Sequence, residues 1–138
     1  MEIAIKEAKK AFKKGEIPVG AVVVKNGKII CKAHNLKETK KLSTAHAEII
    51  AINKACKKNE NWRLNDCELY VTLEPCMMCS GAIIQSRFST VIYGTKNIND
   101  GCSDILEKNN VRVFSGVCEE ECQKLMRDFF IKKRNQSL

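Results

Sequence analysis

The sequence lacks the long apolar segments that would carry a chain into or across a membrane. It has no run of about 18 apolar residues, the length that a spanning helix needs. Its first six residues, Met1-Glu2-Ile3-Ala4-Ile5-Lys6, do not form the apolar core of a secretory signal. We therefore expect a cytoplasmic protein with no membrane partner. Internal repeats, linkers and low-complexity tracts are also missing, so the sequence predicts one domain over residues 1–138.

Histidine is scarce and cysteine is not. The chain has two histidines, His34 and His46, and eight cysteines. Without a secretory signal, cysteines favour free thiols or metal ligands over disulfides. Most cysteines outside the Pro75–Cys79 segment are expected to be small core residues. Cys118 and Cys122, four positions apart on a predicted helix, leave a second metal pair open as an alternative.

Basic residues outnumber acidic ones, 24 to 16, which gives a net charge of +8. A basic surface favours polyanions and speeds their capture. The lysines are widely spread, however, and only Ile131–Arg134 forms a dense run. Charge alone therefore leaves a nucleic-acid partner undecided.

Two short segments together predict a metal site. Thr44–Glu48 contains His46 and Glu48, and Pro75–Cys79 contains Cys76 and Cys79. One histidine and two cysteines make three ligands for Zn²⁺, and a catalytic zinc site keeps its fourth position for water. The order H-x-E followed by P-C-x-x-C is typical of zinc deaminases that act on nucleobases. The alternative is a structural four-coordinate zinc with a fourth ligand from another cysteine.

The spacing of the two cysteines suits a helix that begins at the motif. Cys76 and Cys79 would share one face of a helix over residues 76–86, with Pro75 in its first turn. The positive end of the helix dipole favours thiolates. Two helix starts would then meet at one metal, because His46 lies at the start of a second predicted helix.

That second helix is predicted over residues 44–58, with Ser43 and Thr44 as N-caps. Glu48 lies about 200° around it from His46. We therefore expect Glu48 beside the metal-bound water rather than on the metal. Zinc lowers the pKa of bound water toward about 7. The resulting hydroxide would attack a ring carbon that bears an amino group, while Glu48 moves the proton to the ring nitrogen and to departing ammonia.

The order of predicted elements indicates an α/β fold. Asn26-Gly27 between two apolar runs predicts a hairpin. A strand over 68–73, the helix over 76–86 and a strand over 90–94 form a βαβ unit, which implies parallel neighbours. We expect a central mixed five-stranded sheet in a three-layer α/β/α arrangement. The full set of expected elements is helices over 2–14, 44–58, 76–86 and 118–134, a helical turn near 103–108, and strands over 20–24, 28–33, 68–73, 90–94 and 111–114.

Segments across nearly the whole chain match one family pattern. They are Ile17–Val22, Ala33–Asn35, Thr44–Ile49, Leu69–Cys79, Gly81–Arg87, Val91–Gly94 and Asp128–Phe130. With these segments the chain resembles the cytidine deaminase superfamily, and within it the bacterial tRNA-specific adenosine deaminases. The zinc motif is typical of the superfamily, whereas the Met-Cys-x-Gly-Ala stretch and the Phe-Phe-basic ending narrow the resemblance.

The resemblance implies a cytidine deaminase-like fold and hydrolysis of adenosine to inosine at the wobble position of a tRNA anticodon. It implies one Zn²⁺ per subunit on His46, Cys76 and Cys79, with Glu48 as the proton shuttle. The implied partner is a tRNA anticodon stem-loop. The family is a homodimer whose RNA site is completed across subunits, and we expect the same here.

The resemblance also assigns substrate contacts. Asn35 matches the asparagine that hydrogen-bonds the flipped base, although as a residue it also suits a turn after a strand. Pro18 and Val19 match residues that line the base pocket. Phe130 and Arg134, with neighbouring Lys133, fall in the terminal helix that contacts the anticodon loop. Phe129 and Phe130 could equally be core residues.

Two features depart from the family pattern. Asn97 stands where the family has an aspartate near the nucleic-acid backbone, and the loop that follows is shortened to Asp100–Asp104. Loss of a negative charge at residue 97 suggests weaker discrimination against DNA. The rival functions are a deaminase of a free base or nucleotide, such as guanine or cytidine, and a zinc-bearing RNA-binding subunit without catalysis. The presence of Glu48 argues against the latter.

Overall fold

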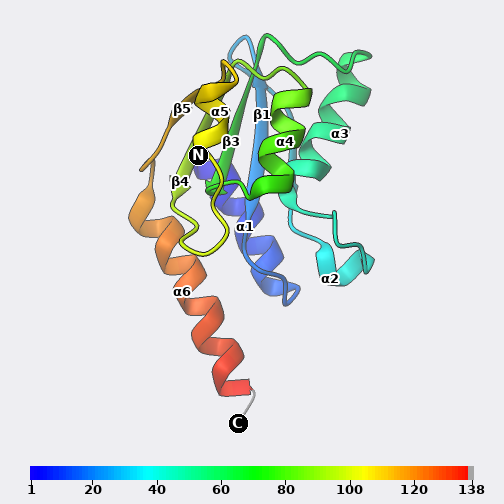
Figure 1. Cartoon of the computed structure of the whole chain (residues 1–138). Helices are drawn as coiled ribbons and strands as arrows, with labels where there is room; N and C mark the ends of the chain where they lie inside the picture. Colours follow the sequence, from blue (N-terminus) through cyan, green and yellow to red (C-terminus); the bar gives the residue numbers. More distant parts are fainter. Residues whose placement is uncertain (137–138) are drawn as a thin grey trace.

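A computed structural model, which describes residues 1–136, shows three layers with the sheet in the middle (Figure 1). The helices are α1 (Glu2–Lys13), α2 (Lys37–Lys40), α3 (Ala47–Asn59), α4 (Met77–Gln85), α5 (Asp104–Lys108) and α6 (Glu119–Gln136). The strands are β1 (Gly20–Lys25), β2 (Lys28–His34), β3 (Cys67–Leu73), β4 (Thr90–Thr95) and β5 (Arg112–Phe114). Every predicted element is present, and the predicted α/β/α fold is confirmed. The short helix α2 was not predicted. Within the described part of the chain, no helix is long and apolar enough to span a membrane.

The sheet is mixed, as the sequence predicts. Its strand order is β2-β1-β3-β4-β5. β1 runs antiparallel to β2 and β3, whereas β3, β4 and β5 are parallel. Asn26 and Gly27 have φ values of 50° and 76°, which are the positive angles that a two-residue I′ hairpin turn requires. The end of β2, the start of β1 and the end of β3 therefore lie at one edge of the sheet.

The helices cover both faces of the sheet. α1 and α6 pack against each other and against one face, while α3, α4 and α5 cover the other. Two glycines allow close packing on the first face. A Cβ on Gly20 would collide with the backbone of α1, and a Cβ on Gly94 would collide with Cys122 of α6. These contacts hold α1 and α6 directly on β1 and β4.

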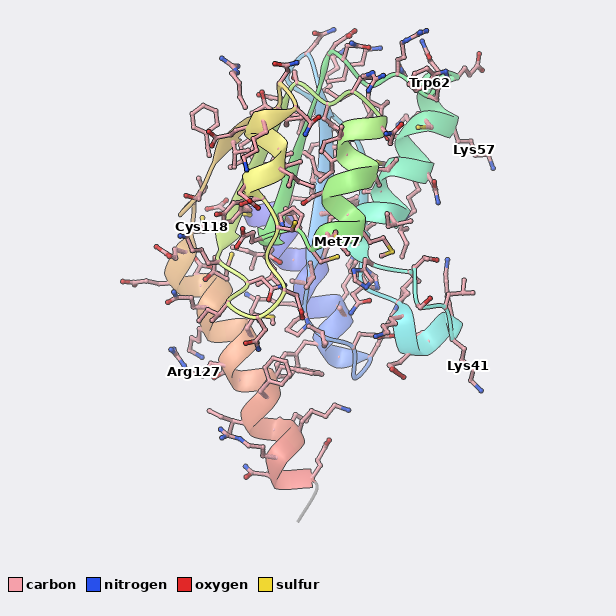
Figure 2. The ribbon with its side chains drawn as sticks, viewed as in Figure 1. Lys41, Lys57, Trp62, Met77, Cys118 and Arg127 are labelled. Carbon is pink, nitrogen blue, oxygen red and sulfur yellow. The ribbon has the colours of Figure 1, made fainter. Side chains whose placement is uncertain are left out.

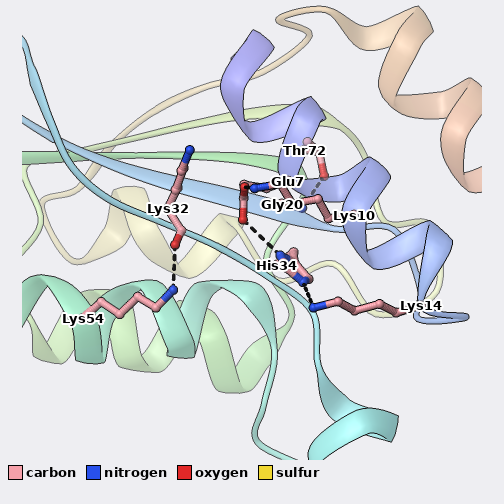
Figure 3. A network of polar contacts seen from close by, with 8 residues as sticks. All are labelled: Glu7, Lys10, Lys14, Gly20, Lys32, His34, Lys54 and Thr72. Carbon is pink, nitrogen blue, oxygen red and sulfur yellow. Dashed lines mark hydrogen bonds and ion pairs between the residues drawn. The ribbon is translucent and has the colours of Figure 1, made fainter.

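A polar network ties α1 to the end of β2 (Figure 3). Glu7, only 4% exposed, accepts a hydrogen bond from His34 Nδ1 at 3.0 Å. Lys14 Nζ lies 2.9 Å from His34 Nε2, and Lys10 Nζ lies 2.7 Å from the second Glu7 oxygen. The strand end that carries Asn35 is thereby fixed to α1.

Replacing Glu7 with Gln should destabilise the fold by about 1–3 kcal/mol at pH 7, because a buried hydrogen-bond network loses its charged acceptor. Burial acts to raise the pKa of Glu7, but hydrogen bonds from His34 and Lys10 outweigh it and lower the pKa below the ordinary 4.5. A lowered pKa in the folded state stabilises the fold fully above pH 4.5 and loses this effect as the pH falls through the folded-state pKa.

Urea unfolding of the wild type and the Glu7→Gln variant at pH 7 and at acidic pH tests this. The difference in unfolding free energy should be largest at pH 7 and should shrink at acidic pH. Glu2→Gln, an exposed change on the same helix, should have little effect at either pH. A Glu7→Gln penalty independent of pH would contradict the role of the charge.

Candidate active site

A pocket of about 430 Å³ opens at the sheet edge where β2 and β3 end and β1 begins. The first residues of α3 and α4 form one wall, and the loop after β4 forms another. Its lining residues are Ile17, Val19, Asn35, Lys37, His46, Ala47, Glu48, Leu73, Glu74, Cys76, Met77, Met78, Asn97 and Asp100. Met77, 74% exposed, stands at the amino-terminal end of α4 (Figure 2). A volume of this size is in the usual range for small-molecule sites.

The three predicted metal ligands meet in this pocket. His46 Nδ1 lies 3.7 Å from Cys76 Sγ and 3.5 Å from Cys79 Sγ. Their ligand atoms all lie within 4.8 Å of one another. Zinc bonds of about 2.3 Å to sulfur and 2.0 Å to nitrogen in a tetrahedron separate S and N by about 3.6 Å. The donor set and its spacing therefore fit Zn²⁺.

The two ligand helices begin later than predicted. α3 starts at Ala47 with His46 itself in the N-cap position, and α4 starts at Met77 with Cys76 in the N-cap position. Ser43 and Thr44 are therefore not the N-caps, and Pro75 is not in the first turn. Both cap residues have extended backbone, with ψ of 152° and 179°. This conformation directs each ligand side chain from just outside its helix. The predicted meeting of two helix starts is confirmed.

Hydrogen bonds within the cluster favour a thiolate. Donation from the Cys79 thiol, followed by donation from His46, lowers the pKa of Cys76 to about 3. The same contact with Cys76, followed by burial, raises the pKa of Cys79. The hydrogen bond with Cys76 raises the pKa of His46. The thiolate is the form of cysteine that binds metals, so the cluster presents a negative charge to a cation.

Glu48, the second residue of α3, lies beside the cluster and is 4% exposed. Burial raises the pKa of its carboxyl to about 7. A carboxyl that titrates near neutral pH suits an acid–base catalyst. A divalent cation beside it would favour the carboxylate, the form that accepts a proton.

Among the described residues, no fourth His, Cys, Asp or Glu ligand joins the cluster. The ligand group consists of His46, Cys76 and Cys79. Cys102 is near in the backbone, since its N–H donates to the Pro75 carbonyl at 2.9 Å, but its sulfur is not in the group. Within residues 1–136, Cys118 and Cys122 belong to no group of three or more candidate ligands. Three candidate ligands at a pocket wall would leave a fourth position open, as in a catalytic zinc site.

Comparison with known proteins agrees with this arrangement. The model of the MafB19-like deaminase family matches residues 1–134. The tRNA-specific adenosine deaminase of Bacillus subtilis (strain 168) is 50% identical over 144 residues, which cover 99% of this chain and 89% of that protein. The chain belongs to the MafB19-like deaminase family, among the tRNA-specific adenosine deaminases.

Solved structures extend the comparison. One from biochemical and structural studies of A-to-I editing by tRNA:A34 deaminases superposes with a TM-score of 0.86 at 35% identity, over 91% of this chain and 96% of that chain. The guanine deaminase of Bacillus subtilis superposes with a TM-score of 0.67 at 39% identity, over 77% of this chain and 71% of that chain. The first match confirms the cytidine deaminase-like fold. The family makes this chain an enzyme.

In this deaminase, Asn35 is held by its neighbours. Its Nδ2 donates to the Ile17 carbonyl at 3.2 Å, and its Oδ1 accepts from the Lys37 N–H at 3.0 Å. The amide is therefore oriented, and it keeps one donor hydrogen and one acceptor lone pair. Asn35 makes a turn after β2, as the alternative predicts, and it also lines the pocket.

The other predicted contacts lie in three different places. Val19 lines the pocket, whereas Pro18 is buried outside the lining. Asn97 lines the pocket and an adjoining groove of about 430 Å³, which Phe130 also lines. Arg134 is exposed in the last turns of α6, outside both linings. Phe129 packs edge-on against Phe12 and is 4% exposed, so it is the core member of the Phe-Phe pair.

Glu74 was not predicted as a site residue, although it directly precedes Pro75. Its two oxygens accept the N–H groups of Asn97 and Ser103, each at 3.2 Å, and the Ser103 hydroxyl also donates to it. A Cβ on Gly101 would collide with this carboxylate. Glu74 therefore holds the shortened loop over the pocket. Sequence proximity to the motif was the only signal.

Replacing Cys76 or Cys79 with Ser should abolish zinc binding, because each change deletes one of the three candidate ligands. Cys102→Ser should keep a full equivalent, since its sulfur is not in the ligand group. Metal content per chain, measured by inductively coupled plasma mass spectrometry after gel filtration, checks this. Loss of zinc in Cys102→Ser would instead indicate a four-coordinate structural site.

Proposed function

We propose that this enzyme hydrolyses adenosine to inosine at the wobble position of tRNA. The observation that carries the proposal is the His46, Cys76 and Cys79 cluster with buried Glu48 in one pocket of nucleobase size. The names of the relatives support the substrate, and the net charge of +8 suits an RNA partner. Zinc is the metal that this donor set favours.

The side chains of the pocket would have different roles in the reaction. Zinc, held by the three ligands, would supply a water of lowered pKa at neutral pH. Glu48 would take one proton from this water and give it to the ring nitrogen, and would then move the second proton from the new hydroxyl group to the amino group, which leaves as ammonia. Asn35, with its amide already oriented, would hydrogen-bond the base edge. Val19 and Leu73 supply apolar contact that would exclude bulk water from the base.

The surface beside the pocket would receive the anticodon stem-loop. Phe130 is 46% exposed at the groove that adjoins the pocket, where an unstacked base could stack on it. Arg134 and Lys133 follow on the same helix. By resemblance to the family, we expect a homodimer that completes this RNA site, working in the cytoplasm with its tRNA substrate. Pro18 directly precedes Val19 and is buried outside the pocket lining.

A free-base deaminase is the second candidate. It is favoured by the 39% identity to the guanine deaminase of Bacillus subtilis. Both functions would use the same zinc ligands and the same Glu48. Substrate assays therefore have to separate them.

Glu48→Gln should keep zinc and lower inosine formation by about 10²–10⁴-fold, because the variant has lost its proton carrier. The assay uses an anticodon stem-loop with adenosine at the wobble position, and free guanine and cytidine are run in parallel. Zinc content of the variant is the control for folding. Ammonia released from guanine, with the stem-loop unchanged, would replace the tRNA function by the second candidate.

Asn97→Asp should increase the preference for RNA over DNA, because it restores a negative charge near the expected nucleic-acid backbone. The substitution keeps the acceptor that binds the Asp100 N–H, so the turn is preserved. The ratio of kcat/KM for matched RNA and DNA stem-loops measures the effect. Asn99→Asp adds the same charge to the same loop, but in the adjoining groove and not in the pocket, and it should change the ratio less. An unchanged ratio in Asn97→Asp would refute the hypothesis.

A further inference from the structure

Lys37 occupies an unusual electrostatic position. Among the described residues, Lys37 and His46 are the basic residues that line the pocket, and the other charged lining residues are Glu48, Glu74 and Asp100. The Lys37 side chain is exposed at the mouth. Within residues 1–136, no carboxylate forms an ion pair with its ammonium. The pocket mouth therefore presents a cation that the fold itself does not use.

A buried carboxylate anchors the short helix that carries Lys37. Glu16 is 1% exposed. Its Oε1 accepts the Glu38 N–H at 3.0 Å, and its Oε2 accepts the Thr39 N–H and the Thr39 hydroxyl, both at 2.6 Å. Burial acts to raise the pKa of Glu16, but these hydrogen bonds outweigh it and lower the pKa. The anchor is thus a carboxylate at neutral pH.

A second contact joins the α1–β1 connection, which contains Glu16, to the segment after β2. Asn35 donates to the carbonyl of Ile17, the residue after Glu16, and accepts from the N–H of Lys37. The contact with Ile17 crosses from the α1–β1 connection to the segment after β2, and the contact with the Lys37 N–H fixes Lys37 to Asn35 within that segment. Lys37 therefore lies between two fixed points, Asn35 on one side and the Glu16–Thr39 contact on the other.

We propose that Lys37 binds a backbone phosphate beside the target nucleotide, and that Glu16 is the positioning residue that holds α2 for this contact. The inference rests on the proposed RNA substrate. A base inside the pocket leaves its charged phosphates outside, at the mouth, where an ammonium can neutralise one of them. Phosphate contacts of this kind set the register of the strand, while Asn35 contacts the base.

Lys37→Ala should raise KM for the stem-loop about fivefold to tenfold with kcat little changed, because the contact is made before and during the reaction. The slope of log affinity against log salt should fall by about 0.7, the value for one contact to a single strand. Lys57→Ala is the matched control, since Lys57 is exposed on α3 and lies away from the pocket in Figure 2. It should resemble the wild type.

Uncharged backbone linkages in the RNA can identify the phosphate that Lys37 contacts. Stem-loops carrying a single methylphosphonate at each linkage around the target adenosine are compared on wild type and Lys37→Ala. At one linkage, the wild type should lose affinity and the Lys37→Ala variant should lose nothing more. A Lys37→Ala penalty that persists at every linkage, or a variant equal to Lys57→Ala, would overturn the phosphate contact.

Thr39 tests the anchor without changing a pocket residue. Thr39→Val removes the hydroxyl that donates to Glu16, and Thr39→Ser keeps it. Thr39→Val should raise KM for the stem-loop about threefold with kcat little changed, and Thr39→Ser should behave as wild type. In the Lys37→Ala background, Thr39→Val should add nothing, because the two changes act on one contact. Additive effects would overturn the positioning role of Glu16.

Inosine formation by the wild type distinguishes failure of this inference from failure of the proposed function. Inosine formation by the wild type, combined with a Lys37→Ala variant equal to Lys57→Ala, would reject this inference and keep the proposed function. No inosine from any RNA would reject both.

Discussion

The crossover between two parallel strands is the constraint on which the site depends. β3 and β4 pair in parallel, so the chain has to return along a face of the sheet through α4. The return begins at Cys76, directly beyond the carboxyl end of β3. α3 packs against α4 on the same face and begins at the same edge. Ligands distant in the sequence therefore meet because two helices start at one sheet edge.

Three buried glutamates show how nearby hydrogen-bond donors determine the pKa of a buried carboxyl. Glu7, Glu16 and Glu48 are each at most 4% exposed. Glu7 and Glu16 receive several hydrogen bonds, which lower their pKa values despite burial. Glu48 has fewer compensating contacts, and burial raises its pKa. Glu7 and Glu16 are therefore carboxylates that fix chain segments next to the pocket. Glu48 is suited to exchange a proton.

Local signals in the sequence were sufficient for most of the fold. Asn26-Gly27 predicted the hairpin, and the apolar periodicity of residues 2–14 predicted α1. The grouping of His46, Cys76 and Cys79 was predicted from residue type and spacing. The start of α3 was predicted too early, because Ser43 and Thr44 are good caps by type, whereas the backbone is still extended at His46, which is the N-cap.

The missed features depend on contacts between distant segments. α2 has no buried residue and no apolar pattern, and it is stabilised by Glu16, more than twenty residues earlier. Glu74 binds a loop that follows it by a similar separation. Residue type does not reveal such partners. The resemblance to known deaminases identified Asn35, but the orientation of its amide required the positions of Ile17 and Lys37.

The hydrogen bonds between Glu74 and the loop after β4 restrict which residues of this loop can be substituted, in evolution or in the laboratory. Ile98 is 95% exposed, so residues there can vary at little cost to folding. Gly101 admits no side chain, because a Cβ would meet the Glu74 carboxylate and the Asn97 carbonyl. Substitutions are therefore expected at the tip of the loop, near Ile98, whereas position 101 should accept only glycine. A library aimed at new substrates would explore residues 98 and 99 freely and would lose most members randomised at 101.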